Sequence, residues 1–354
     1  MGTGNTTSTD LAVKYVRTVS LVIYCLIFVI GVLGNGLVIY VTGFRMKRTV
    51  NSVWFLNLAL ADFLFTAFLI FSIVSLYQDY QWHFGEFMCK LNSFVSLVNM
   101  FASVFLLAAI SLDRCLTIWA VVWAQNKRTV RKAQILSTVI WLTAGICSVP
   151  YATFRKMYRN FCAYPEMTKK QYWSLYVFRF VVGFLIPFLV IFSSYVAIAV
   201  RAKRLQNTRR WRTIRIIFSM VFAFFICWLP FHVLSFIELK INSRKSIVRV
   251  LSPLAVSLAF MNSCLNPILY VFMCDEFQKK LRKSICFVLE SALAEDRLSY
   301  ASSHSLTSHL SRISRKSDSA SPLDGKDAVT SITFTESKVI TTEGTQSTKE
   351  DVHI

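Results

Sequence analysis

The sequence predicts an all-α membrane protein built as a bundle of seven transmembrane helices and followed by a disordered tail. Of its 354 residues, 55% are hydrophobic and only 16% are charged, whereas about a quarter of the residues in a soluble domain are charged. Seven apolar segments are each long enough to span a bilayer, which takes about 20 residues. This composition does not fit a purely aqueous environment, so we expect an integral membrane protein.

The seven segments also define the expected domains. They lie at 18–43, 50–77, 91–118, 133–154, 172–200, 216–237 and 250–273. We expect residues 1–17 to form an amino-terminal tail and residues 18–273 the membrane domain, and the polar, Ser- and Thr-rich stretch 291–354 to be disordered. The two halves show no internal repeat of the kind found in many transporters. Because seven is odd, the two ends of the chain should lie on opposite sides of the membrane.

The distribution of Lys and Arg indicates the orientation of the bundle. Basic residues are concentrated after the first, third, fifth and seventh segments, a side that we take as cytoplasmic. The opposite side is also basic, so this bias alone does not decide the orientation. The sequon Asn5-Thr6-Thr7 predicts glycosylation of Asn5 and agrees with an extracellular amino terminus. The net charge of +20 therefore suggests basic loops at a plasma membrane, and we expect no nucleic-acid partner.

Ionisable residues inside membrane spans are candidates for function, and Asp62 lies near the middle of segment 50–77. A carboxylate at this depth must face the bundle interior, bind a cation or be protonated. Polar side chains in two other segments could complete a site with it, namely Asn99, Ser103, Asn262 and Asn266. Their oxygens suit a small hard cation such as sodium, and we expect no other cofactor. For each amide taken singly, the alternative is a hydrogen bond between helices.

Prolines interrupt several of the later segments and predict kinks. Pro187, Pro230 and Pro267 each remove one backbone hydrogen bond from a helix. Kinks in the last two segments would provide pivots for a conformational switch. Packing geometry alone is the alternative explanation.

Seven short motifs occur in a fixed order, one on each segment: "GNGLV", "LALAD", "LDRC", Trp141, Pro187 with Tyr195, "CWLP" and "NPILY". In this order they resemble the rhodopsin-like G-protein-coupled receptors, over residues 18–290. The resemblance implies that Asp113 and Arg114 hold a resting state, and that Arg114 later meets a heterotrimeric G protein. It also implies a switch formed by Tyr195, Trp228, Pro230, Asn266, Pro267 and Tyr270. Adjacent helical side chains do not face each other, so the contact between Asp113 and Arg114 should be partial, as suits a releasable latch.

The same resemblance extends to the ends of the bundle. It implies a disulfide between Cys89 and Cys162, both on the side predicted to be extracellular and oxidising. Residues 274–290 resemble the short amphipathic eighth helix of the family. Cys286 follows its basic stretch and is either palmitoylated or unmodified. The Ser-rich tail, if phosphorylated by receptor kinases, is expected to recruit arrestin.

Two arginines on the outer side suggest the class of ligand. Arg155 follows segment 133–154, and Arg179 lies within segment 172–200 among apolar neighbours. Guanidinium groups suit carboxylates, whereas the outer half of the third segment, "NSFVSLVNMF", lacks the aspartate that receptors for amine ligands carry there. Interfacial snorkelling is the alternative for each arginine. These features favour a peptide or small-protein agonist with a free carboxyl terminus.

Longer stretches, including "TGFRMKRTVNSVWFLNLALADF" and "FASVFLLAAISLDRC", are similar to the chemoattractant branch of the family. The stretch "LESALAEDRLSYASSHS" is most similar to chemerin receptors. The resemblance implies coupling to inhibitory-class G protein, calcium release, chemotaxis and inflammation. A complement anaphylatoxin or formyl-peptide receptor is the alternative, although Leu97 replaces an acidic residue of the formyl-peptide receptors. A decoy receptor and a transporter are more distant alternatives. We expect no enzyme, because no Ser–His pair or metal cluster recurs across the spans.

Overall fold

The computed structural model describes residues 3–202, 208–240 and 246–273. The predicted eighth helix (274–290), Cys286 and the tail 291–354 lie outside this range. The described elements, in chain order, are α1 (Thr3–Tyr40), η1 (Val41–Arg45), α2 (Val50–Tyr77), α3 (Gly85–Trp119), α4 (Val121–Lys127), α5 (Val130–Thr153), β1 (Lys156–Tyr158), β2 (Phe161–Ala163), α6 (Lys169–Phe180), η2 (Val181–Leu185), α7 (Ile186–Ala202), α8 (Thr208–Lys240) and α9 (Ser246–Met273).

The described residues contain seven helices long and apolar enough to cross a membrane, which confirms the predicted bundle. Their bounds are Leu11–Arg45, Val50–Tyr77, Gly85–Trp119, Val130–Thr153, Lys169–Arg201, Val221–Lys240 and Val250–Ile268. The third of them is the central one: 61% of its most apolar window is buried, against 28–44% in the others. It packs against α2, α5 and α7, while α9 packs against α1 and α8.

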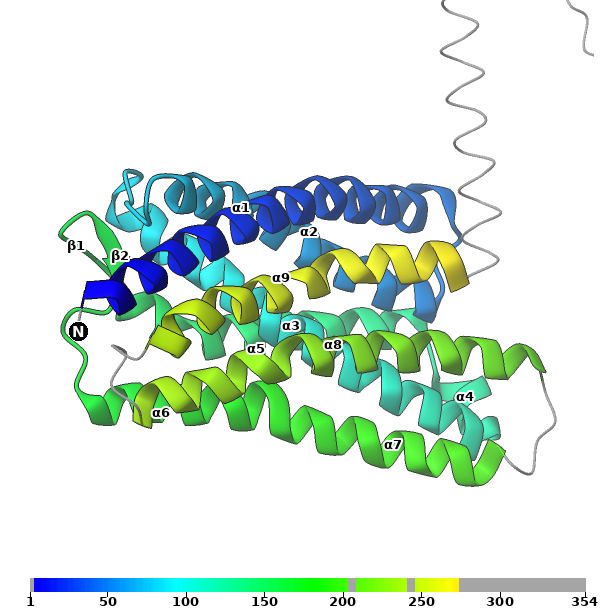
Figure 1. Ribbon diagram of the computed structural model, residues 1–354. Coiled ribbons are helices and arrows are strands. Elements are labelled where there is room, and N and C mark those ends of the chain that lie inside the picture. Colours follow the sequence, from blue (N-terminus) through cyan, green and yellow to red (C-terminus); the bar gives the residue numbers. More distant parts are fainter. Residues whose placement is uncertain (1–2, 203–207, 241–245, 274–354) are drawn as a thin grey trace, which may run out of the picture. The chain divides into compact units, whose positions relative to one another are not determined.

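The two ends of the bundle differ in what they carry (Figure 1). The β1–β2 hairpin and the start of α1 lie at one end, which we call the disulfide end because it carries Cys89 and Cys162. The short helix α4 lies at the opposite end, which we call the Arg114 end. The two sets of predicted functional residues are thus separated by the length of the helices.

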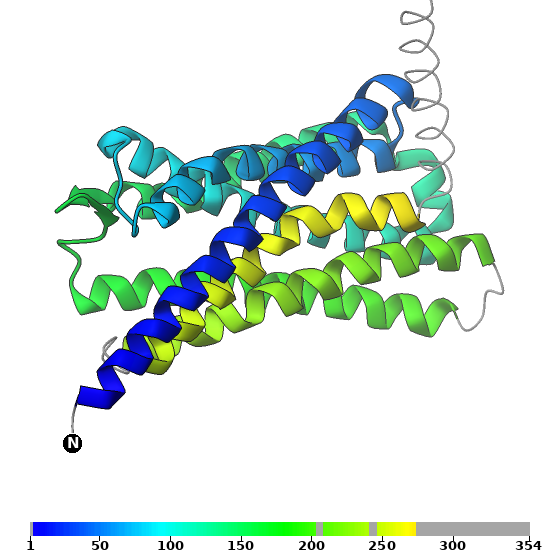
Figure 2. The same ribbon diagram turned by 45° about the horizontal axis from the view of Figure 1, so that its top comes forward.

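The first helix begins earlier than its apolar pattern suggests. We expected the span to start at residue 18, but α1 runs unbroken from Thr3 and crosses the bundle obliquely (Figure 2). Lys14 and Arg17 interrupt the apolar run, so hydropathy alone does not mark this extension. Arg17 forms an ion pair with Asp79, in the turn after α2, which helps to hold the extended part of α1 against its neighbour.

Local hydrogen bonds explain where several helices begin. Thr49 and Ser52 form a reciprocal capping box at the start of α2, with bonds of 3.1 and 2.8 Å. Thr168 and Gln171 form the same motif at the start of α6. Each capping box pairs two backbone N–H groups, one of the N-cap residue and one of the third helical residue, that the first turn would leave unpaired.

Proline also shapes the fifth span as predicted for Pro187. The span is divided into α6, the π-helical turn η2 and α7. Pro187 lies two residues after the end of η2 and cannot donate a backbone hydrogen bond to the preceding turn, so the helix widens there. Gly183 in η2 lies so close to Met100 of α3 that a Cβ would be only 2.8 Å from the methionine Cε. Glycine therefore permits the close approach of the fifth span to the central helix.

A β-hairpin between α5 and α6 was not predicted from the sequence. Strands β1 and β2 pair antiparallel, with Met157 opposite Cys162. The turn residues Arg159 and Asn160 have positive φ angles of 48° and 64°, as a two-residue type I′ hairpin requires. The usual Asn-Gly or Asp-Gly signal is absent, which explains why the sequence did not reveal the hairpin.

Candidate functional site

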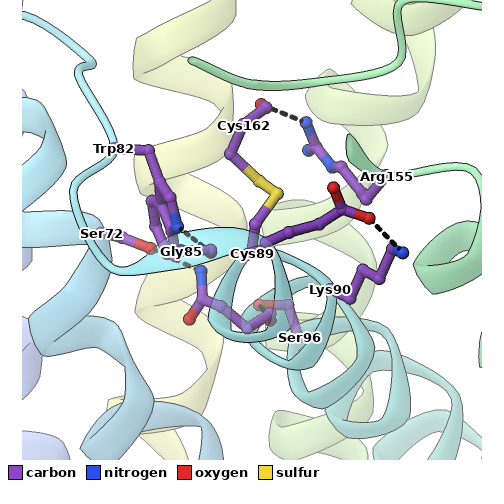
Figure 3. Close-up of a disulfide and its surroundings, with 10 residues drawn as sticks. Ser72, Trp82, Gly85, Cys89, Lys90, Ser96, Arg155 and Cys162 are labelled. Atoms are coloured by element: carbon purple, nitrogen blue, oxygen red, sulfur yellow. Dashed lines mark hydrogen bonds and ion pairs between the residues drawn. A yellow bond between two sulfur atoms is a disulfide. The ribbon is translucent and has the colours of Figure 1, made fainter. Parts of the chain in front are cut away.

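The disulfide predicted from the family resemblance is confirmed and fixes the hairpin over the bundle. Cys89 in the second turn of α3 is bonded to Cys162 in β2, with a Cα–Cα distance of 5.7 Å. The same region contains Arg155 and the loop residue Trp82, whose indole donates to the Gly85 carbonyl (2.9 Å) (Figure 3). The hairpin is therefore held covalently to the central helix at the mouth of the bundle.

A cavity of about 640 Å³ opens beside this disulfide, between the hairpin and helices α1, α2, α3, α8 and α9. Hydroxyl and carboxamide side chains make up much of its lining, and Arg155 and Glu238 give it charges of both signs. Tyr80 in the loop after α2 also lines it. Burial raises the pKa of the Tyr80 phenol, although the positive charge of Arg17 opposes this effect. The Tyr80 hydroxyl is therefore neutral and able to donate a hydrogen bond.

Arg155 lies at this cavity, where the sequence led us to expect a ligand group. It follows the end of α5, and its Nη1 donates to the Cys162 carbonyl oxygen at 2.7 Å (Figure 3). Its guanidinium carbon lies 4.2 Å from the centre of the Tyr164 ring. The disulfide and the hairpin thus position this cation, while its Nε has no hydrogen-bond partner.

Arg179 lies deeper and against a different helix. It is only 9% exposed and is not among the described residues that line the cavity. Its guanidinium lies 4.7 Å from the ring centre of Tyr176 and 4.5 Å from that of Phe231 in α8. One Nη2 donates to Ser235 Oγ at 3.2 Å, and its Nε is without a partner.

Three tyrosine rings connect the two arginines. The Tyr164 ring makes a cation–π contact with Arg155 and lies edge-on to Tyr172, with ring centres 6.1 Å apart. Tyr172 stacks on Tyr176 at 6.4 Å, and Tyr176 in turn makes a cation–π contact with Arg179. The series brings the two cations into one aromatic setting at the disulfide end. Sequence reasoning missed it, because tyrosines at 164, 172 and 176 signal nothing unless the hairpin folds back on α6.

In the bundle interior, Asp62 joins part of the predicted polar cluster. Its side chain is fully buried, and its Oδ2 accepts a hydrogen bond from Asn266 Nδ2 at 2.7 Å. The Asn99 amide satisfies most partners when its nitrogen donates to Asp62 Oδ1 (3.0 Å) and lies 3.2 Å from Ser103 Oγ. No described cation forms an ion pair with Asp62. A buried carboxylate without a cation requires neutralisation, and the neighbouring hydroxyl oxygens fit a sodium ion.

The remaining members of the cluster differ from the prediction. Asn262 is buried, but no hydrogen bond joins it to Asp62, Asn99 or Asn266 in the described residues. Ser263 takes the central place instead: its Oγ donates to the Asn99 oxygen at 2.9 Å, and its carbonyl accepts from Asn35 at 2.9 Å. The helical spacing of three from Ser263 to Asn266 places both on one face, a signal that sequence reasoning overlooked.

The predicted switch residue Trp228 lies within an aromatic cluster of α8. Its ring contacts Phe224 at 5.9 Å, Phe231 at 5.7 Å and His232 at 6.3 Å between centres. Pro230 lies inside α8 within this cluster. The cluster thus surrounds the point where α8 lacks a backbone hydrogen bond.

At the Arg114 end, Asp113 and Arg114 make the partial contact that their adjacency predicted, with Nη2 and Oδ2 3.4 Å apart. The main partner of Asp113 is instead Arg128, whose Nε and Nη2 donate to both carboxylate oxygens at 2.7 and 2.9 Å. Arg114 donates to the Asn51 oxygen, which Arg128 also contacts at 2.7 Å. The carboxylate is therefore shared between two arginines, which weakens its hold on Arg114.

Three further predicted residues are placed only in part. Tyr195 of α7 lies close to Ser111 and Arg114, as expected for a group that later meets the arginine. Tyr270 lies in α9 beyond Pro267, and Asn5 lies in the first turn of α1, but the side chains of Tyr270 and Asn5 fall outside the described set.

Comparisons with known proteins agree with this geometry. The family described as "7 transmembrane receptor (rhodopsin family)" matches residues 34–270. The chain is similar to the C3a anaphylatoxin chemotactic receptor of Danio rerio, with 42% identity over 297 residues and 82% of each chain covered. It is 40% identical to chemerin-like receptor 1 of Homo sapiens, over 81% of this chain and 83% of the relative. It is 39% identical to chemerin-like receptor 2 of Rattus norvegicus, over 83% and 86%.

Proposed function

Because the chain belongs to the rhodopsin family of seven-transmembrane receptors, we propose that it is a receptor for a peptide or protein chemoattractant of the chemerin type. A member of this family is a receptor of the plasma membrane with several spans, and not an enzyme. We further propose that the amino terminus and the disulfide end face the outside of the cell. The agonist would then reach the cavity from the extracellular medium.

The observation that carries this proposal is the pair of arginines at the disulfide end. Arg155 and Arg179 are connected by a series of three tyrosine rings in contact, and each has an unpartnered Nε. Neither forms an ion pair with a described carboxylate. Guanidinium groups held in this way suit a terminal carboxylate, and capture of a peptide's carboxyl end is a recurring recognition mode.

The Arg114 end supports the signalling part of the proposal. The Asp113 carboxylate is shared by Arg114 and Arg128, so Arg114 can leave without stranding an unpaired acid. We propose that it then contacts a heterotrimeric G protein of the inhibitory class, with calcium release and chemotaxis as outputs. Receptor kinases and arrestin would act on the tail, and sodium bound beside Asp62 would favour the resting state.

A complement anaphylatoxin receptor is the second candidate. It is favoured by the 42% identity to the Danio rerio receptor and by Glu238, which brings an acid to the same cavity as Arg155. An agonist with a cationic group beside its carboxylate would use both charges, whereas an uncharged carboxyl-terminal residue would use only the arginine.

The test uses calcium release in cells expressing the full chain. Three kinds of peptide are compared, each as the free acid and as the amide: the carboxyl-terminal peptide of chemerin, the carboxyl-terminal peptide of C3a, and a formylated peptide. Because a hydrogen bond to a charged group contributes about 1.5–3 kcal/mol, Arg155→Ala or Arg179→Ala should lower the potency of the active peptide about ten- to a hundredfold. Amidation should lower the potency on the parent receptor by a similar factor, and on either variant much less.

Arg159→Ala provides the matched control. Arg159 lies in the hairpin turn, with its guanidinium 5.3 Å from the Tyr158 ring, and it does not line the cavity. Its replacement should leave potency and the amidation effect unchanged. If amidation weakens the parent and both arginine variants equally, these residues do not bind the carboxylate.

A further inference from the structure

Arg179 is the one predicted ligand group that contacts a helix of the switch. It projects from α6, yet two of its contacts are to α8: the hydrogen bond to Ser235 Oγ at 3.2 Å and the stacking on Phe231 at 4.5 Å. Among the described residues, no carboxylate forms an ion pair with it. Its close partners are therefore neutral: the Tyr176 ring on its own helix, and Ser235 and Phe231 on α8. Glu238 of α8 is near enough for the two charges to interact, but no ion pair joins them.

Ser235 and Phe231 lead directly to the proline region of α8. Ser235 uses both of its hydrogen-bonding functions, since its hydroxyl donates to the Phe231 carbonyl at 2.7 Å while it accepts from Arg179. The Phe231 ring lies edge-on to Trp228, with ring centres 5.7 Å apart. Pro230 lies between these two aromatic residues. Arg179 is thus connected through Ser235 and Phe231 to the region of Pro230, where α8 lacks a backbone hydrogen bond and can bend.

We propose that the contact of Arg179 with Ser235 and Phe231 is an autoinhibitory tie that holds α8 against α6 in the ligand-free receptor. The inference rests on the proposed function in one respect, that the anion which breaks the tie is the carboxylate of the agonist. A carboxylate forms charge-assisted, two-pronged bonds with a guanidinium and competes with a neutral hydroxyl. Arg179 then leaves Ser235, and α8 is free to move about Pro230.

The tie is a resting-state contact, so it contributes to the equilibrium between states even without an agonist. A contact shifts such an equilibrium only by the difference in its free energy between the two states. If the tie exists in the resting state alone, removing it should raise the active fraction by the equilibrium factor of one hydrogen bond, roughly two- to tenfold.

The test therefore measures basal nucleotide exchange on a panel of heterotrimeric G proteins, with the full-length receptor in membranes and no ligand present. Ser235→Ala should raise basal exchange roughly two- to tenfold at matched surface expression. Ser235→Thr keeps the hydroxyl and should stay near the parent. Ser257→Ala is the matched control: Ser257 is also buried and donates to the Pro253 carbonyl at 2.8 Å, but it contacts no described arginine.

A second variant approaches the tie from α6. Arg179→Gln should also raise basal exchange, and the double variant with Ser235→Ala should exceed neither single variant, because both remove the same contact. Equal basal exchange in the parent, Ser235→Ala and Arg179→Gln would overturn the tie. An amidation penalty that is absent in the parent receptor, or equal in the parent and both arginine variants, would instead overturn the proposed ligand class, and it leaves this ligand-free measurement untouched.

Discussion

At the scale of single residues, Asp62 shows how the bundle accommodates a buried charge. Its two carboxylate oxygens accept hydrogen bonds from Asn266 and Asn99, but amides do not cancel a negative charge. Sodium and a proton are the two ways to neutralise it. The oxygens of Ser103 and Ser263 beside the amides are the ligand type that a hard cation prefers, and on this ground we propose sodium.

Replacement of Asp62 by Asn tests this interpretation. Sodium that binds the resting state should weaken agonist binding in the parent receptor, because a ligand stabilises the state it prefers. Asp62→Asn removes the charge, so agonist affinity should no longer depend on whether sodium or a large organic cation is present. Ser148→Ala serves as a control, since Ser148 is buried in α5 and donates only to its own helix. Equal sodium sensitivity in Asp62→Asn and in the parent would contradict the site.

Residue-scale prediction succeeded where the signal lay within one segment. The buried Asp62 and the adjacent pair Asp113 and Arg114 are visible as charges inside apolar runs. Arg128 and Ser263 were missed because their roles depend on neighbours far away in the sequence: Arg128 reaches Asp113 only when α4 folds back. The sequence marks which groups must be paired, whereas only the packing of helices decides their partners.

At the scale of elements, the loop between α3 and α5 controls the latch. Helix α4 is only seven residues long, and Arg128 directly after it binds Asp113 while also sharing Asn51 with Arg114. Two arginines compete for one carboxylate and one amide oxygen. We therefore expect Arg114, and not Arg128, to be the residue whose loss stops signalling.

The comparison of two alanine variants checks this assignment. Arg114→Ala should retain agonist binding but lose most agonist-stimulated nucleotide exchange, since the cation expected to contact the G protein is gone. Arg128→Ala should lower exchange only in part, because Asp113 can then hold Arg114 more firmly while the cation expected to contact the G protein is still present. Radioligand binding and exchange are measured at equal surface expression. Near-normal exchange in Arg114→Ala would count against its role.

The predictability of the elements follows from the strength of their patterns. All seven spans were recognised because apolar runs of this length have few alternatives in water. The π-helical turn η2 was foreseen only as a kink at Pro187, since the sequence gives the missing hydrogen bond but not how the helix compensates. The β1–β2 hairpin depends on positive φ angles at Arg159 and Asn160, and no glycine marks that turn.

At the scale of the whole molecule, orientation is the property that decides how every site is used. The proposed cavity receives an extracellular ligand only if the disulfide end faces outward. In intact cells, an antibody against an amino-terminal epitope tag should bind without permeabilisation. The parent receptor should also become smaller on treatment with a glycosidase, while Asn5→Gln should show no such change. Antibody binding only after permeabilisation would reverse the orientation.

The unbroken first helix has a consequence for what can reach the cavity. Its 38 residues extend about 57 Å at 1.5 Å per residue, whereas the hydrocarbon core of a bilayer is about 30 Å thick. Arg45 and Arg48, close to its far end, favour the headgroup region there, so most of the surplus projects from the disulfide end. A disordered segment of this length could pass over the mouth of the cavity, whereas the helix borders the cavity on one side through Ser20 and Tyr24. If the disulfide end faces outward, as we propose, an agonist would meet an entrance bordered on one side by α1, and a glycan on Asn5 would be held away from the membrane.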